Sequence, residues 1–206
     1  YAIHKSKEYG CKNITFQQAD ILRMDNIGQK FDYITSSGVL HHLQDPMKGW
    51  RILCGFLKED GLVMISLYSK IARGFIIEAQ MKAKQHGFTS DPGSMKEFRR
   101  KSGELLGEKA LSRIKYVDYY NLNMYRDLLF HVQEHNYDLL DLEKILRDLN
   151  LEFLGFCLSP KIKQDYARLY PEDSQGVNLQ NWHQFELQKT LTFQAMYQFW
   201  CRKIQR

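Results

Sequence analysis

FDYITSSGVLHHLQDP, residues 31–46, is the stretch of this sequence that decides the fold. The run Phe31–Ile34 predicts a buried strand, and the small residues Ser36–Gly38 end it just before a helix-like segment that carries His41 and His42. A strand that stops at small residues before a helix is how an open α/β sheet exposes its backbone to a ligand. The stretch therefore predicts a ligand site at one end of a sheet strand.

Length and composition indicate one globular core. The chain has 206 residues, 44% of them apolar, and a net charge of +5, which is too mild and too spread out to predict a nucleic-acid partner. No apolar run approaches the ~20 residues of a membrane span, so we expect no membrane partner. Widely spaced cysteines without a CxxC pair predict no metal site and favour a reducing, cytoplasmic location; they are Cys11, Cys54, Cys157 and Cys201.

The order of elements favours a parallel α/β sheet with later additions. We expect helices over residues 1–9, 45–57, 139–149 and 182–187, and strands over residues 13–18, 31–35, 62–68, 152–158 and 195–202. The near-continuous apolar run 62–68 predicts a strand that is buried on both faces. A turn is expected at 58–61. Residues 69–123 are charged and helical in pattern and read as a helical insertion, and the segment with Pro160 and Pro171 reads as a loop.

Several of these pieces resemble the class I S-adenosylmethionine (SAM) methyltransferases. KNITFQQAD (12–20) looks like the third strand of that fold, residues 31–42 look like the fourth strand with its loop, and residues 57–67 are similar to the turn and fifth strand. The two late strands resemble the sixth and seventh, which pair antiparallel at a sheet edge. The resemblance implies a Rossmann-like α/β sheet, SAM as cofactor, and transfer of a methyl group to an acceptor, either a small molecule or a protein.

The same resemblance implies two sets of cofactor contacts. The Asp20 carboxylate would accept a hydrogen bond from the adenine amino group, and the Ile21 amide would donate to a ring nitrogen. The loop beside the methionine part of SAM would act mainly through its backbone, and consists of Ser36, Ser37, Gly38 and Val39. From the residues alone, the alternatives are a turn residue at Asp20 and ordinary helix-entry serines.

Three histidines are candidates for the chemistry. His41 and His42 are adjacent, and helical neighbours project ~100° apart, so joint metal binding is not expected. We predict that one of these two, or His131, faces the acceptor as a general base. The alternative is that they are partly buried polar residues at the rim of a pocket.

HVQEH (131–135) has the spelling H-x-x-E-H of one class of zinc peptidases. On a helix, His131 and His135 would share a face, but a parallel sheet is the wrong context for that class. We expect instead a lid above the strand ends, whose substrate side is formed by Arg126, Asp127, Glu134 and His135. The alternative is a hydrogen-bonded helix network.

The C-terminal half is similar to methyltransferase domains that follow tetratricopeptide repeats in some bacterial proteins. The matching pieces are residues 126–135, 151–156, 181–182 and 196–200. We expect residues 1–68 to be the C-terminal part of the SAM-binding core, residues 69–150 to be a helical insertion or lid with the last core helix, and residues 151–206 to complete the same domain.

The family's glycine-rich loop after its first strand, and the acidic residue that ends its second strand, have no counterpart in this sequence. The expected sheet order is 3-2-1-4-5-7-6, so strand 3 would lack a neighbour, and unpaired buried backbone is costly. We therefore expect the missing strands to come from upstream sequence or from another chain, and the 206-residue chain alone to be inactive. The alternative function is a degenerate scaffold of the same fold that binds no cofactor.

Overall fold

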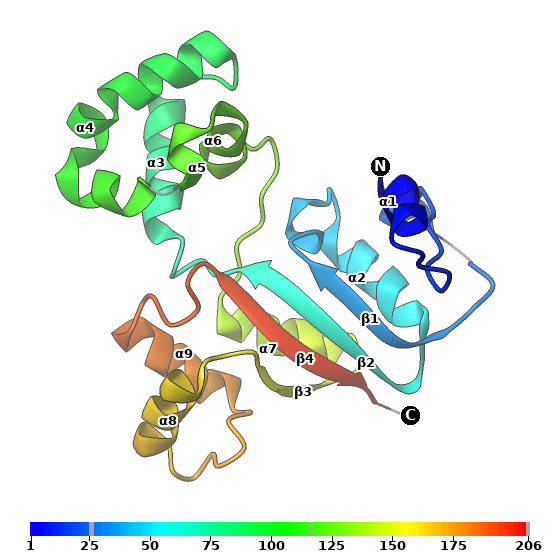
Figure 1. The fold of residues 1–206 in the computed structure, drawn as a ribbon. Coiled ribbons are helices and arrows are strands. Elements are labelled where there is room, and N and C mark those ends of the chain that lie inside the picture. The colour runs from blue at the N-terminus through cyan, green and yellow to red at the C-terminus, as the bar shows by residue number, and fades with distance from the viewer. Residues whose placement is uncertain (25–26, 116, 205–206) are drawn as a thin grey trace.

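The described residues of this computed structural model, 1–24, 27–115 and 117–204, build a mixed sheet of four strands (Figure 1). The strands lie in the order β1 (Phe31–Ser37), β2 (Leu57–Tyr68), β4 (Met196–Lys203) and β3 (Leu151–Phe156). β1 runs parallel to β2, whereas β4 runs antiparallel to both of its neighbours. This is the order 4-5-7-6 that the resemblance implied, and the predicted α/β fold class is confirmed.

The expected turn at Lys58–Gly61 is an irregularity inside β2. Phe31 pairs with Leu57, whereas Tyr33 pairs with Leu62, so the four residues between these partners bulge out of the ladder. A bulge keeps a strand continuous while bending it locally. β2 therefore begins earlier than the sequence predicted.

Helices cover one face of the sheet. They are α2 (Pro46–Gly55), α7 (Leu139–Asp148) and α9 (Leu179–Gln188), and α7 lies behind the sheet in Figure 1. Because side chains alternate along a strand, the alternating buried apolar residues of the two central strands share this face: Val63, Ile65, Leu67, Tyr197, Phe199 and Cys201. Trp50, Leu142 and Phe185 of the three helices belong to the same core. The main core thus lies between the sheet and a single layer of helices.

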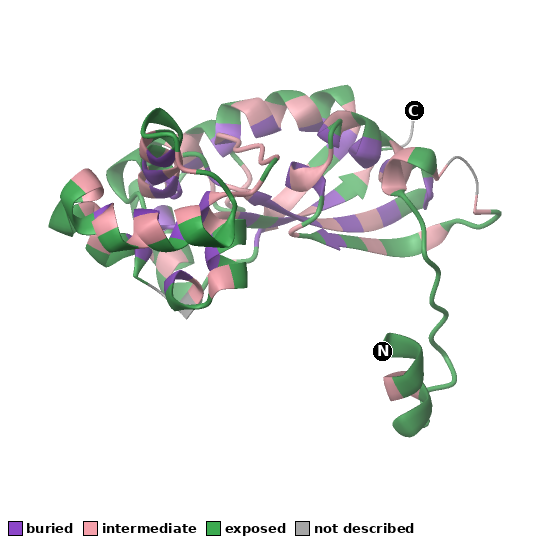
Figure 2. Ribbon diagram, turned by 90° about the horizontal axis from the view of Figure 1, so that it is seen from above, coloured by how far each residue is buried: buried purple, intermediate pink, exposed green. Residues whose placement is uncertain are grey.

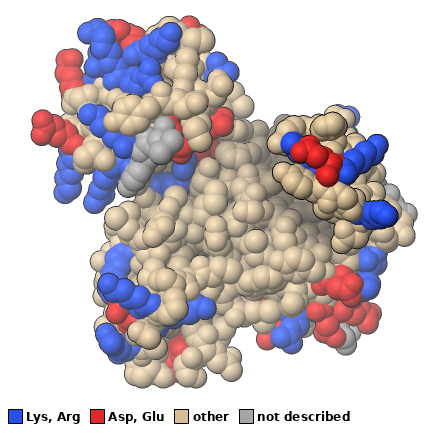
Figure 3. Space-filling view, in the orientation of Figure 1, with Lys and Arg blue, Asp and Glu red and all other residues tan. Residues whose placement is uncertain are grey.

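The middle of the opposite face carries no helix in the described part of the chain (Figure 2). Tyr33 is 45% exposed, and its ring lies 5.1 Å from that of Trp200, which is half-buried. Figure 3 shows this central surface without Lys, Arg, Asp or Glu. β1 also has a strand partner on one side only, so its outer edge is unpaired by any described strand.

A second group of helices stands apart from the sheet, between β2 and α7 in the chain (Figure 1). Its members are α3 (Gly74–Gln85), α4 (Pro92–Ile114), α5 (Val117–Tyr120) and α6 (Leu122–Leu129). They enclose a separate core that includes Ile76, Phe98 and Tyr125. α4 is broken at Gly107, which has a left-handed φ of 75°. These four helices are called the helical group below.

The predicted strand over residues 13–18 is wrong. Residues 11–20 are exposed and form no ladder, and α1 (Ala2–Glu8) buries none of its residues. NITFQQ has the composition of a strand, but a strand needs a neighbour to pair its backbone groups. Without a described neighbour the segment stays extended and unpaired.

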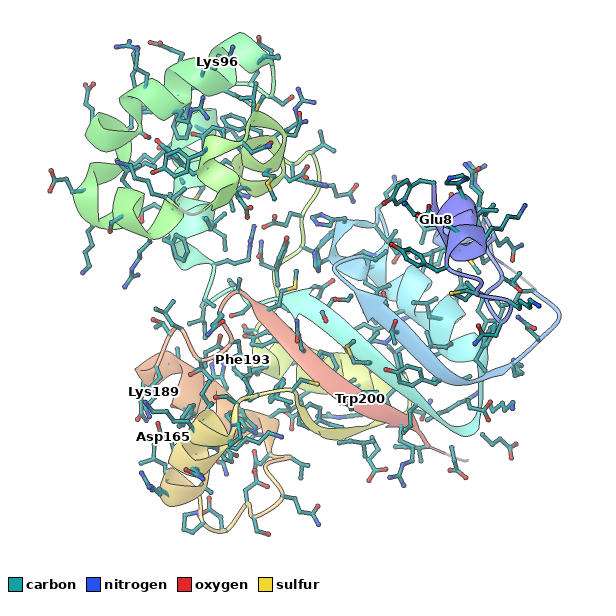
Figure 4. All side chains as sticks on the ribbon, viewed as in Figure 1. Glu8, Lys96, Asp165, Lys189, Phe193 and Trp200 are labelled. Carbon is teal, nitrogen blue, oxygen red and sulfur yellow. The ribbon has the colours of Figure 1, made fainter. Side chains whose placement is uncertain are left out.

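Two helices also differ from expectation. The predicted helix that begins near Val39 is a single 3₁₀ turn, η2 (Leu40–His42), and α2 follows it. A further helix, α8 (Pro160–Leu169), occupies part of the predicted loop. Ser159 caps α8, and Pro160 fills its first turn, which is a recognised helix start. Asp165 of α8 pairs with Lys189 at the end of α9, at 3.1 Å (Figure 4).

No helix among the described residues has the length and apolarity to cross a membrane.

Substitutions at two adjacent residues of β4, one on each face of the sheet, test whether the core lies on one face only. Phe199→Ala removes a fully buried ring and is expected to lower the free energy of unfolding by about 3–5 kcal/mol. Trp200→Ala, on the open face, is expected to cost less than half as much. Urea unfolding followed by circular dichroism measures both. Equal losses would show that the open face is packed as tightly as the covered one.

Candidate functional site

Tyr68, the last residue of β2, is the centre of a stacked cluster. The His41 ring lies 3.9 Å from the Tyr68 ring, at an interplanar angle of 29°. The guanidinium carbon of Arg73 lies 3.7 Å from the centre of the same ring. Both groups lie within 4 Å of the ring centre, so they must occupy its opposite faces. The cluster is therefore a stack of imidazole, phenol ring and guanidinium. The positive guanidinium is attracted to the face of the aromatic ring above which it lies.

The loop after β1 brings the two adjacent histidines to this stack. Gly38 turns the chain with a left-handed φ of 71°, which only glycine adopts without strain. His41 in η2 is fully buried. The His42 ring lies 4.0 Å from that of His131, and His42 Nδ1 lies 3.0 Å from the Gln133 carbonyl oxygen. A carbonyl only accepts, so His42 Nδ1 donates, and its Nε2 is left as the acceptor of the neutral ring.

The segment 131–137 is irregular and not helical, and it links the loop after β1 to the end of β2. The His135 amide donates to the His41 carbonyl at 2.9 Å, and the Tyr137 amide donates to the Tyr68 carbonyl at 3.0 Å. Gln133 adds a side-chain bond to the Leu43 carbonyl at 3.0 Å. The expectation that H-x-x-E-H lies on a helix is therefore wrong. Within the described ranges, no three metal-binding side chains converge.

A buried ion pair fixes this segment to α3. Arg73 Nη2 donates to Glu134 Oε2 at 2.9 Å, and each side chain is only 5% exposed. Asn136 donates to the other Glu134 oxygen at 3.1 Å. Arg73 Nε has no partner among the described residues. The charge of Arg73 is thus neutralised, while one of its donors is still unused.

The environment of His41 keeps it neutral. Its pKa is lowered to about 3, mainly by burial and in addition by electrostatic interaction with His42, Arg73 and His131, while a backbone group of Ser66 opposes the shift. Such a weak base is unsuited to take a proton from an acceptor near neutral pH. Among the three predicted bases, the geometry favours His42 and His131.

The residues predicted to form the cofactor loop lie at the end of β1. The Ser36 side chain is buried, and its Oγ has no partner in the described part of the chain. Ser37 is exposed, and so is Val39 at 38%. A buried hydroxyl without a partner, next to a glycine turn and accessible backbone, fits the polar end of a small ligand.

Asp20 and Ile21 have local roles in the structure. The Asp20 carboxylate accepts from the Leu22 amide at 3.0 Å and so caps η1 (Ile21–Arg23). Its second oxygen lies 3.5 Å from Arg23 Nε in an exposed ion pair, so a ligand could reach the Asp20 carboxylate but would compete with Arg23 for it. Ile21 packs toward α2, because a Cβ at Gly49 would lie 3.5 Å from Ile21 Cγ2.

The predicted substrate-side residues divide into two sets. Glu134 and His135 each bond to a member of the stacked cluster, whereas Arg126 and Asp127 are exposed on α6 and form no side-chain hydrogen bond or ion pair within the described residues. Sequence reasoning missed Tyr68 and Arg73. Tyr68 had a signal, since it closes the predicted strand 62–68, but Arg73 had none.

A second buried network, also missed, fixes α9 to the strand ends. Glu186 is fully buried and accepts hydrogen bonds from Ser69 Oγ at 2.5 Å and from the Tyr197 hydroxyl at 2.7 Å. Ser69 Oγ in turn accepts from the Ala72 amide at 2.9 Å. Burial raises the pKa of Glu186, and the two hydroxyl donors oppose that shift.

Comparison with known proteins identifies the family of this chain. The family described as a methyltransferase domain matches residues 1–114, which is more than half of the chain. The chain belongs to the class I SAM-dependent methyltransferase domains. Methyltransferases of this class carry their ligand at the strand ends of an open α/β sheet, which is where β1 and the stacked cluster meet.

Individual relatives of this methyltransferase domain are longer than the chain. An uncharacterized protein of Synechococcus sp. is 28% identical over 156 residues, covering 69% of this chain and 36% of that protein. Two structures of PKMT2 from Rickettsia typhi, one in complex with AdoHcy, cover 97% of this chain and 40% of theirs. Their TM-scores are 0.64 with AdoHcy and 0.68 without, at 17% and 15% identity, so they support the fold alone.

Because His41 is held neutral in the fold, the free energy of unfolding should decrease at acidic pH. Its ordinary pKa is 6.5 and its pKa in the fold is about 3, so below pH 6.5 the unfolded chain binds a proton that the folded chain refuses. Stability contributed by this residue is present above pH 6.5 and is lost as pH falls. His41→Phe keeps a flat ring over Tyr68. It should reduce the loss of unfolding free energy between pH 6.5 and 4.5 by roughly 2 kcal/mol.

The control for this experiment is His86→Phe, the same change at an exposed histidine. Urea unfolding at the two pH values gives the difference for each protein. The control should lose as much free energy of unfolding between the two pH values as the unmodified chain does. If His41→Phe loses as much unfolding free energy on acidification as the unmodified chain, a buried neutral imidazole at this position would be contradicted.

Proposed function

We propose that this chain is part of a SAM-dependent methyltransferase that transfers a methyl group to an acceptor bound beside Tyr68. The observation that carries the proposal is the junction of two strand ends. β1 ends in accessible small residues with a buried unpartnered hydroxyl at Ser36, and β2 ends in the stack of Tyr68 between His41 and Arg73. AdoHcy bound to PKMT2, a protein of similar fold, supports SAM as the cofactor.

The residues present fit the polar ends of that cofactor. Ser36 Oγ and the backbone of Ser37 and Gly38 would hold its methionine part, and the exposed Asp20 oxygen would accept from the adenine amino group. When bound, SAM supplies an electrophilic methyl group on sulfur. The task of the chain is then to hold an acceptor in line with that methyl group and to exclude competing water.

His42 is the best-oriented group for moving a proton. Its Nδ1–H donates to the Gln133 carbonyl, which fixes the tautomer and leaves Nε2 basic. His131 stacks against it and is held in turn by the Gln133 amide, which donates to His131 Nδ1 at 3.1 Å. We assign His42 as the candidate base and His131 as the residue that positions it.

We also propose that further strands of the same polypeptide pair with the free edge of β1 and that the segments connected to them cover the open sheet face. The uncharged surface around Tyr33 and Trp200, the unpaired outer edge of β1 and the exposed segment 11–20 support this. The matched relatives have the extra length, since this chain covers 36% and 40% of them. Association with tetratricopeptide repeats is retained as a prediction from the C-terminal resemblance.

Calorimetric titration with SAM tests both proposals. The intact polypeptide is expected to bind at micromolar concentrations, and the 206-residue chain alone is expected not to bind. Binding by the shorter chain would contradict the need for further strands. No heat of binding by the intact polypeptide would favour the alternative, a degenerate scaffold of the same fold.

Two glycines with the same left-handed φ supply a matched pair of variants. Gly38 and Gly28 both have a φ of 71°, so alanine is expected to strain each by about 1–2 kcal/mol. Gly38→Ala disturbs the proposed cofactor loop and is expected to weaken SAM binding at least tenfold. Gly28→Ala is expected to leave the affinity within twofold. Equal effects of the two changes would show that only general stability had been altered.

A further inference from the structure

Two adjoining hollows lie between the helical group and the turn that leads into β4. Their volumes are about 540 and 510 Å³. Both are lined by the same four residues: Arg73, Asp118, Gln194 and Ala195. Tyr68, Met196 and Gln198 add a wall of strand residues to the first, and Phe75, Ile76 and Leu128 add an apolar wall of helix residues to the second. The shared residues make this a single elongated site.

The site continues directly from the proposed cofactor loop. Met196, which lines the first hollow, is so close to the loop that a Cβ at Gly38 would lie 3.9 Å from Met196 Cε. Tyr68, in the same wall, stacks on His41 of the loop. A molecule in the hollow would therefore lie next to the end of β1, where the methyl donor is proposed to bind.

One charge in the site is uncompensated. Arg73 and Asp118 are the charged residues that line the described hollows, and the charge of Arg73 is already paired with Glu134 at 2.9 Å. The Asp118 carboxylate forms no hydrogen bond or ion pair within the described residues, while its charge acts on Tyr68 across the hollow. The remaining lining is apolar or neutral. Such a site carries one net negative charge and favours a cation.

The turn that closes the site is strained in a way that its surroundings enforce. Gln194 has a φ of 49° and Ala195 a φ of 109°, and left-handed backbone at residues other than glycine is concentrated at ligand sites. The Ser69 amide donates to the Ala195 carbonyl at 2.8 Å. Ser69 is itself held by the buried Glu186. The Glu186 network thus preserves the shape of the hollow.

We propose that this hollow is the acceptor site and that it binds a primary or secondary amine on an apolar stem, with Asp118 as the anion that attracts it. The inference rests on the proposed methyl transfer. The ammonium pairs with Asp118, and its stem lies along Phe75, Ile76 and Leu128. Once the ammonium has released a proton to His42, the candidate base, the nitrogen lone pair forms the new N–C bond. The S–C bond of SAM breaks, and its electron pair stays on sulfur.

Binding of n-hexylamine to the intact polypeptide, measured by calorimetry with and without SAM, tests the assignment. Hexanoate and 1-hexanol share the stem and differ in the head group. The amine is expected to bind at least tenfold more tightly than either. Asp118→Asn should weaken amine binding at least tenfold and leave SAM affinity within twofold. The control is Glu78→Gln, an exposed carboxylate on α3, which should change neither affinity.

A second variant tests the proposal in case Asp118→Asn folds poorly. Leu191, 55% exposed, lines the second hollow, so Leu191→Lys adds a positive charge there at little cost to folding. It should also weaken amine binding at least tenfold. Equal binding of the three head groups, or amine binding that neither variant alters, would overturn the inference even if SAM binds normally. Absence of SAM binding would instead overturn the proposed function on which the inference rests.

Discussion

The buried ion pair between Arg73 and Glu134 is the interaction on which this end of the molecule depends. Both side chains are almost completely buried, and removing one partner of such a pair leaves an uncompensated charge that costs about 3–5 kcal/mol. The two residues come from segments 61 positions apart in the chain. Their pairing holds the segment 131–137 against the end of β2, and that segment in turn fixes His42 through the Gln133 carbonyl.

The ends of the two parallel strands have opposite chemistry. β1 ends in Ser36, Ser37 and Gly38, whose small size leaves the backbone accessible. β2 ends in Tyr68, whose ring is stacked between two other planar groups. Parallel strands place these ends at the same edge of the sheet. One edge therefore combines a polar surface, where we propose that the cofactor binds, with an aromatic wall beside it, where we propose that the acceptor binds.

Local pattern and resemblance together predicted most of the sheet. The apolar run ending at Tyr68 and the small residues after Ile34 are signals within single segments, and the strand order followed from the family. The strand predicted for NITFQQ (13–18) was wrong because a strand-like composition does not form a strand without a neighbour to pair with. The helix considered for HVQEH (131–135) was wrong because five residues are too few to establish a helical period.

The parts of the site that sequence could not provide are the pairings between distant residues. Nothing near Arg73 in the sequence indicates Glu134, and nothing near Ser69 indicates Glu186. Asp118 is an ordinary acidic residue until the fold places it in a hollow where the other charges are already paired. Such properties belong to the tertiary arrangement, in which burial decides whether a charge is neutralised or available.

The place of β4 in the sheet has a consequence for how the chain acquires its structure. β4 lies between β2 and β3, although it follows both of them in the sequence. During synthesis β2 has a free inner edge and β3 has no sheet to join until Met196–Lys203 has left the ribosome. Contacts across such long sequence separations form slowly, and exposed strand edges associate with other chains. The central pairings of this sheet are therefore expected to form only after β4 has been synthesised, and the partly built sheet must be shielded until then.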